Sequence, residues 1–104
     1  MAYIGKVEIS NEWQKVEDLV KEQVSGQSSF AFLSETKYQL QCEGDYGARL
    51  CNAESAPTEQ KDGEMVLLSQ TAIYEPELGA ELYTRVHTLK PGFPCYLKIS
   101  KIGD

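Results

Sequence analysis

The sequence predicts a mainly β protein, an antiparallel β-sandwich or small barrel with one short N-terminal helix. Three observations lead to this fold class. Short runs of alternating apolar and polar residues recur along the chain, which is the period of half-buried strands. Clusters of turn-forming residues separate these runs at intervals typical of sandwiches and barrels. One early segment has instead the three- and four-residue period of an amphipathic helix.

The size and composition of the chain indicate a single folded unit. Its 104 residues are the usual length of one domain, so we expect a single β-rich domain over residues 1–104. Hydrophobic residues make up 41% and charged residues 25%, which is close to globular averages and argues against wholesale disorder. No linker, repeat or segment of low complexity divides the chain.

The first two elements are a strand and the helix. Residues 3–9 alternate as a half-buried strand. Residues 12–23 are predicted to form the helix, because apolar residues recur on one face from Trp13 to Val20 and Asn11 is a suitable N-cap. We expect Trp13, at the start of this stripe, to anchor the helix on the sheet.

The rest of the chain is predicted to form strands separated by turns. The expected strands cover residues 30–33, 37–42, 48–53, 65–68, 70–74, 82–88 and 95–102. Residues 43–47 contain two glycines and supply turn chemistry, which predicts a hairpin between the strands on either side. Cys42 and Cys51 could face each other across it. We favour two reduced core thiols over a disulfide, because Cys is commonly buried as a thiol.

The charge balance excludes several partners. The formal net charge of −6, with no cluster of Lys and Arg, argues against nucleic acid and against an anionic membrane surface. The sequence contains neither a recognisable signal peptide nor an apolar run of about 20 residues. Its three Cys do not resemble a secreted disulfide framework. We therefore expect the protein in the cytoplasm during synthesis, or carried out of it as part of a particle.

No catalytic, cofactor-binding or metal-binding site is predicted. His87 is the only histidine and there is no Cys-x-x-Cys, so a zinc site cannot be assembled convincingly. Acids beside glycine, such as Glu43 and Asp45, are interpreted as solvated turn residues rather than calcium ligands or a glycosidase pair. We expect a protein that binds or assembles, and not an enzyme.

Aromatic residues indicate where binding takes place. Tyr46 falls in the expected hairpin turn and should be exposed. Tyr83, Arg85 and His87 share one face of the strand 82–88, opposite the face that is expected to be buried. Tyr and Arg are enriched at the energetic centres of protein interfaces, so these four residues are the predicted interface positions. Alternatively, Tyr83 packs against a neighbour on an adjacent strand.

Several segments follow one another in an order that resembles a known group of proteins. They are 13–19 (Trp-Gln-Lys-Val-Glu-Asp-Leu), 38–41 (Tyr-Gln-Leu-Gln), Pro57, Gly63, 79–85 (Gly-Ala-Glu-Leu-Tyr-Thr-Arg) and 97–100 (Leu-Lys-Ile-Ser). This order resembles small phage and prophage virion proteins of the tail, head-fibre or capsid-decoration type. The resemblance implies a compact β domain that forms symmetric oligomers, often trimers, within a virion. It implies no catalytic residues.

We therefore predict a non-catalytic structural or binding protein, a virion accessory component of a phage or prophage. It would self-assemble as a homo-oligomer and contact other virion or host proteins. One alternative is a monomeric carbohydrate- or peptide-binding module that uses Tyr46. Another is an acidic phage-encoded inhibitor of a host protein, which would gather acids such as Glu8, Glu17, Asp18 and Glu22 on one face.

Overall fold

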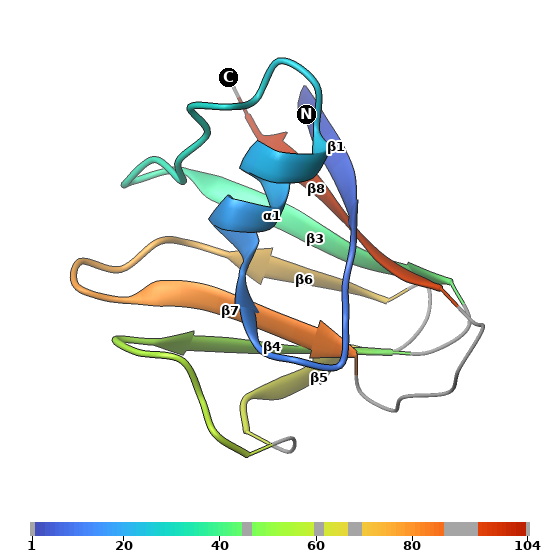
Figure 1. Ribbon diagram of the computed structural model, residues 1–104. Coiled ribbons are helices and arrows are strands. Elements are labelled where there is room, and N and C mark those ends of the chain that lie inside the picture. Colours follow the sequence, from blue (N-terminus) through green and yellow to red (C-terminus); the bar gives the residue numbers. More distant parts are fainter. Residues whose placement is uncertain (1, 45–46, 60–61, 67–69, 87–93, 104) are drawn as a thin grey trace.

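The computed structural model describes residues 2–44, 47–59, 62–66, 70–86 and 94–103. Two four-stranded sheets, both antiparallel, pack face to face, and one short helix lies at their side (Figure 1). The predicted fold class is confirmed: the molecule is mainly β and sandwich-like.

The first sheet, called sheet A, has the strand order β1-β8-β3-β6. Its strands are β1 (Ala2–Glu8), β8 (Cys95–Ile102), β3 (Lys37–Gly44) and β6 (Thr71–Tyr74). The two central strands alternate between buried and more exposed side chains over most of their length. Tyr38 and Leu40 of β3, with Leu97 and Ile99 of β8, therefore form the centre of the core.

The second sheet, called sheet B, has the strand order β2-β7-β4-β5. Its strands are β2 (Gln14–Lys15), β7 (Glu81–Val86), β4 (Ala48–Ala53) and β5 (Glu64–Val66). Leu50, Leu82 and Val86 are buried in the same core as the inner side chains of sheet A. The buried hydroxyl of Thr84 is satisfied, because it donates a hydrogen bond to the carbonyl oxygen of Arg49 at 2.9 Å.

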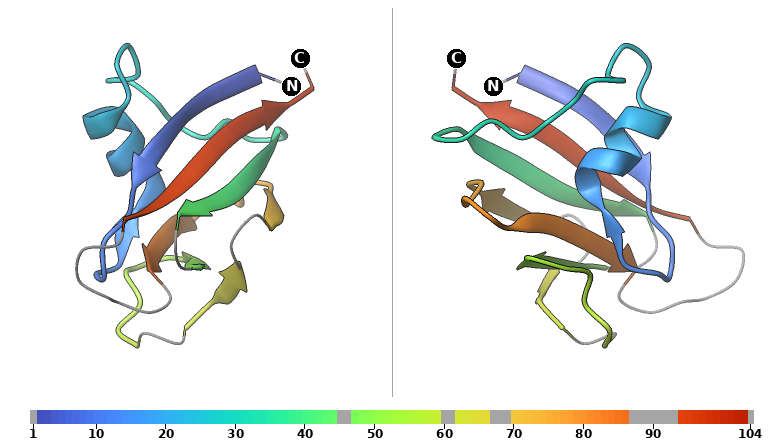
Figure 2. Two further views of the ribbon diagram at one scale, coloured as in Figure 1. Left: turned by 90° about the vertical axis from the view of Figure 1, so that its right-hand side faces the viewer. Right: turned by 60° about the vertical axis from the view of Figure 1, so that its left-hand side comes forward.

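Helix α1 (Val16–Gln23) packs on β1, β2 and β7, and so covers one side of the sandwich (Figure 2). Its apolar stripe is buried as the sequence predicts. The helix ends at the expected residue but begins four residues later than expected. The difference arises because Gln14 and Lys15 pair with β7 instead of forming the first helical turn. Asn11 is therefore not the N-cap, and Trp13 lies outside the helix.

The free edge of β1 is partly covered by a side chain from the end of α1. The backbone N–H of Glu8 donates to Oε1 of Gln23 at 2.7 Å, and Nε2 of Gln23 donates to the carbonyl oxygen of Glu8 at 2.9 Å. The side-chain amide thus occupies the place that the backbone of another strand would take. An edge closed in this way is a poorer template for pairing with a second chain.

Two further expectations about strands are wrong. Residues 30–33 form no strand; Phe30 and Phe32 instead pack edge to face against each other. The strands β3 and β4 do not form a hairpin, because they belong to different sheets. Cys42 consequently lies beside Cys95 in the core, whereas Cys51 lies on the outer face of sheet B opposite Tyr83.

Within the described residues, α1 has only eight residues, and no helix has the length and apolar character needed to cross a membrane.

Candidate functional site

The structure corrects the predicted interface at Tyr83. Tyr83 was expected to be exposed, but only 6% of its surface is accessible. The indole N–H of Trp13, just before β2, donates to the carbonyl oxygen of Glu59, in the connection after β4, at 2.9 Å. Tyr83 lies opposite Lys15 of β2 on one side and Cys51 of β4 on the other, so it stands within sheet B and not at its edge.

Of the other three predicted interface residues, the structure describes only Arg85. Arg85 is half-buried, and its Nε donates to the carbonyl oxygen of Val86 at 3.3 Å. His87 and Tyr46 lie outside the described residues, so their interface roles stay predictions. The carbohydrate platform suggested for Tyr46 stays a prediction for the same reason.

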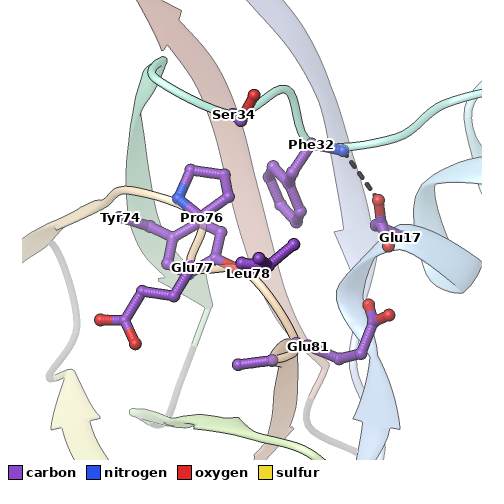
Figure 3. Close-up of a pocket in the computed structure, with 10 residues that line it drawn as sticks. Glu17, Phe32, Ser34, Tyr74, Pro76, Glu77, Leu78 and Glu81 are labelled. Atoms are coloured by element: carbon purple, nitrogen blue, oxygen red, sulfur yellow. Dashed lines mark hydrogen bonds between the residues drawn. The ribbon is translucent and has the colours of Figure 1, made fainter.

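A pocket opens at one end of the sandwich, between sheet A and sheet B (Figure 3). Its volume is about 240 Å³. It is lined by residues from α1, the segment before β3, the end of β6 and the connection into β7: Glu17, Phe32, Ser34, Tyr74, Pro76, Glu77, Leu78, Gly79, Ala80 and Glu81. Its walls therefore come from three parts of the chain that are far apart in the sequence, at residue 17, residues 32–34 and residues 74–81.

Aromatic side chains form a rigid wall of this pocket. The ring of Phe32 lies edge to face against those of Tyr38 and Tyr74, with centroid distances of 4.8 and 4.9 Å. The backbone N–H of Leu33 donates to the hydroxyl oxygen of Tyr38 at 2.9 Å. This bond fixes the segment that carries Phe32, although the segment has no regular secondary structure. Edge-to-face pairs of this kind add about 0.5–1.5 kcal/mol each beyond the area they bury.

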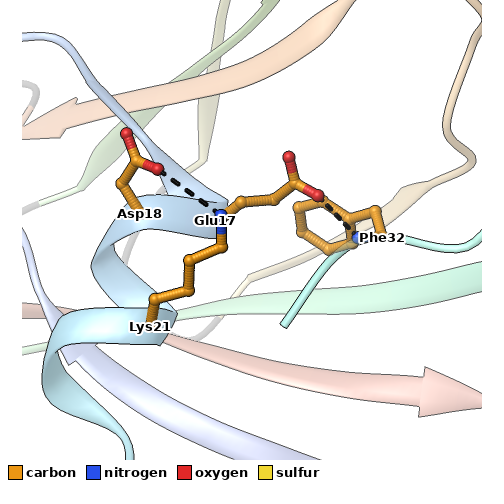
Figure 4. A network of polar contacts seen from close by, with 4 residues as sticks. All are labelled: Glu17, Asp18, Lys21 and Phe32. Atoms are coloured by element: carbon orange, nitrogen blue, oxygen red, sulfur yellow. Dashed lines mark hydrogen bonds and ion pairs between the residues drawn. The ribbon is translucent and has the colours of Figure 1, made fainter. Parts of the chain in front are cut away.

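Glu17 is the most constrained acid in the pocket. Its Oε2 accepts a hydrogen bond from the backbone N–H of Phe32 at 2.7 Å (Figure 4). Burial raises the pKa of Glu17, and the nearby carboxyl of Glu81 raises it further. The hydrogen bond from Phe32 acts in the opposite direction but does not reverse the shift. Lys21, one turn further along the helix, forms an ion pair with Asp18 at 4.0 Å (Figure 4).

Negative charge dominates the whole pocket. Burial and the carboxylates of Glu17, Glu81 and Glu77 raise the pKa of Tyr74 to about 12. The Tyr74 hydroxyl donates a hydrogen bond to Oδ1 of Asn52 in β4, at 3.4 Å, and Asn52 does not line the pocket. Among the described residues that line the pocket, none is basic. The arrangement can therefore attract and hold a cation, but it would repel an anion.

The acids expected to cluster on one face are divided between two places. Glu17 lines the pocket described above. Glu8 and Glu22 line a separate and more open hollow between β1 and α1. Asp18 is exposed and paired with Lys21. Within the described part of the chain, no group of His, Cys, Asp and Glu side chains could hold a metal ion.

The Glu17 carboxylate should lower the stability of the folded protein at neutral pH. A raised carboxyl pKa means that the folded state binds a proton more readily than the unfolded state does, so stability rises as the pH falls through this pKa. We expect Glu17→Gln to raise the Tm at pH 7 by about 2 °C or more, a modest gain because solvent screens this half-buried group. The difference in Tm from wild type should shrink as the pH falls towards 4, because the Glu17 carboxyl becomes increasingly protonated and neutral, as Gln is.

Thermal unfolding followed by circular dichroism between pH 4 and 7 measures this effect. Glu22→Gln is the matched control, since Glu22 is exposed on the same helix. An equal or lower Tm for Glu17→Gln at pH 7 would contradict the expectation.

Sequence patterns did not indicate this pocket. Glu17 was expected only as a helix residue and as one of the acids on one face, and Phe32 and Tyr74 only as residues of the strands 30–33 and 70–74. No protein-family model, curated protein sequence or solved structure matches the chain.

Proposed function

We propose that the protein is a non-catalytic binding domain that receives a positively charged side chain of a partner protein or peptide in this pocket. The observation that carries the proposal is that three glutamates, Glu17, Glu77 and Glu81, line the pocket together with Phe32 and Tyr74. The carboxyl groups of Glu17 and Glu81 lie on the same side of it (Figure 3). Carboxylates form charge-assisted hydrogen bonds with guanidinium and ammonium groups. Aromatic rings add a favourable contact with the same groups.

The strain among the acids supports a cationic ligand. When both are ionised, the carboxylates of Glu17 and Glu81 repel each other. Burial makes the ionised form of Glu17 less favourable still. Local conflicts of this kind, which oppose folding, are expected at functional sites. A bound guanidinium would relieve the repulsion and replace the lost hydration. The same acids would then favour binding while they disfavour the empty folded state.

The size of the pocket favours one side chain over a whole small molecule. Its volume of about 240 Å³ is below the range of roughly 300–1,000 Å³ that is usual for small-molecule sites. Apolar side chains lie at or beside its mouth: Leu78 is fully exposed, and Leu33, next to Phe32, is 54% exposed. These side chains would contact the partner around its charged side chain. Contacts of this kind surround interface hot spots and exclude water from them.

Titration with short peptides tests the proposal. Tripeptides with blocked termini and a central Arg, Lys or Gln would be added at low salt, and the backbone amide signals followed by NMR. Arg and Lys peptides are expected to shift the signals of Phe32 and Glu81, whereas the Gln peptide should not. Glu81→Gln should weaken binding of the Arg peptide about tenfold, which corresponds to the loss of one charge-assisted contact.

Glu54→Gln serves as the control variant, since Glu54 is exposed and does not line the pocket. It should leave the affinity unchanged. Equal shifts with the Gln peptide, or shifts spread evenly over the acidic surface, would show that the pocket does not select a cation. Binding should weaken with added salt, because the interaction is electrostatic.

A second candidate is self-assembly as a virion accessory protein. The observation that favours it is exposed apolar side chains on two edge strands: Ile73 of β6 is 59% exposed and Met65 of β5 is 39% exposed. Pairing of such edges between copies of the chain would build the predicted homo-oligomer, for example a trimer. Light scattering after size exclusion would give a closed multiple of the subunit mass. A monomer at high concentration would exclude this candidate.

A further inference from the structure

Two cysteines lie in contact inside the core. The sulfur atoms of Cys42 and Cys95 are 3.5 Å apart, and each residue is 1% exposed. Cys42 is near the end of β3, and Cys95 is the first residue of β8, the neighbouring antiparallel strand. Both side chains point from sheet A towards sheet B, where the carbonyl oxygen of Gly47 lies 3.9 Å from the Cys95 sulfur.

The strand register places the two cysteines diagonally. Cys42 is opposite Leu97, and Cys95 is opposite Gly44. Diagonal positions are usually too far apart for a disulfide. Here the strands approach closely, since a Cβ on Gly44 would lie only 3.0 Å from the Cα of Cys95 and 2.5 Å from the carbonyl oxygen of Pro94. The missing side chain of Gly44 thus brings the backbone of Cys95 towards β3.

We propose that Cys42 and Cys95 form an intramolecular disulfide that cross-links β3 to β8 when the protein is exposed to an oxidising disulfide such as glutathione disulfide. Bond formation requires the sulfur atoms to approach from 3.5 Å to about 2.05 Å. Both residues lie near the ends of their strands, where a shift of this size disturbs few ladder hydrogen bonds. Cys51 takes no part, because it lies on the opposite face of sheet B.

The reaction proceeds by two exchanges. The thiolate of one cysteine attacks glutathione disulfide, which forms a mixed disulfide and releases one glutathione thiol. The thiolate of the other cysteine then attacks the protein sulfur of the mixed disulfide and releases the second glutathione thiol. The protein loses two protons and two electrons, and glutathione disulfide is reduced to two thiols.

The closed core slows this reaction. The hydrogen bond with Cys95 and burial both raise the pKa of Cys42, so little thiolate is present in the native state. Exchange therefore takes place during folding or when β8 opens transiently. Once formed, the bond joins residues 53 positions apart in the sequence, which restricts the unfolded chain and stabilises the fold.

The test uses Cys51→Ser, which keeps only the proposed pair. The variant is treated with glutathione disulfide in moderate urea, returned to buffer, and compared with the same protein reduced by dithiothreitol. We expect a monomer that has lost two hydrogens, has no thiol reactive towards maleimide after denaturation, and has a higher Tm than the reduced form. A lasting mixed disulfide with glutathione, or an oxidised form with a lower Tm, would overturn the proposal.

The wild-type protein provides a second measurement that does not depend on folding of the variant. After the same oxidation, peptide mapping without reduction can detect any of the pairings among Cys42, Cys51 and Cys95. The Cys42–Cys95 linkage is expected to dominate. A mixture of all pairings, or a dominant Cys42–Cys51 linkage, would mean that the native fold does not favour this pair.

Discussion

Replacement of Gly63 by Ala is expected to lower the free energy of unfolding by about 3 kcal/mol or more. Gly63 has a φ of +77°, a conformation that L side chains rarely adopt. A Cβ at this position would lie 2.2 Å from the carbonyl oxygen of Leu50 and 2.9 Å from the Cβ of Cys51. Because the nearest obstacle is the backbone of β4, rotation of a side chain cannot relieve the overlap. Urea denaturation of the variant measures the loss.

Gly26→Ala is the matched control for this prediction. Gly26 has almost the same backbone conformation, with a φ of +82°, but nothing lies within 4 Å of a Cβ built on it. The free energy of unfolding of Gly26→Ala should therefore fall only by the cost of holding Ala in the left-handed conformation, roughly 1 kcal/mol. Equal losses in the two variants would mean that the connection before β5 does not press against β4 in solution.

Truncation of Leu40 to Ala is expected to destabilise the fold by about 2–5 kcal/mol. Leu40 is fully buried and lies in β3 between Ile99 of β8 and Ala72 of β6. The packed side chains around it cannot move far enough to fill the space that the truncation leaves. A domain of this size has a total stability of about 5–15 kcal/mol, so the variant would lose a large part of it.

Chemical denaturation compares this variant with Gln39→Ala, whose side chain precedes Leu40 on the other face of β3 and is only half-buried. The control should change the free energy of unfolding by less than about 0.5–1 kcal/mol. A small effect at Leu40 would indicate that the centre of the core differs from the one described.

Local patterns predicted the local structure well. The alternation from Lys37 to Cys42 and from Cys95 to Ile102 identified the two longest strands, because every second residue is buried over most of their length. The apolar stripe that ends at Val20 identified the helix. The start of the helix was missed because Gln14 and Lys15 pair with β7, and this contact with a distant strand overrides helix propensity.

Arrangement in space could not be predicted in the same way. The turn sequence at residues 43–47 is compatible with a hairpin and equally with a crossing between sheets, so the sequence alone did not separate Cys42 from Cys51. Tyr83 was assigned to an exposed face because the strand pattern alone cannot show that β7 is flanked by β2 and β4 and that Tyr83 is buried between them. The pocket was missed because Glu17 and Glu81 meet only after the whole chain has folded.

The position of β8 has a consequence for the order in which the chain can fold. β8 lies between β1 and β3, so until residues 95–102 are present β1 has no strand partner and β3 can pair only with the short strand β6. During synthesis on a ribosome, the centre of sheet A therefore waits for a segment made some fifty residues after β3. Folding that depends on such distant pairings is slow, and it leaves apolar strands exposed meanwhile. A nascent chain stalled before residue 95 should accordingly be a target for chaperones, although the finished domain is small.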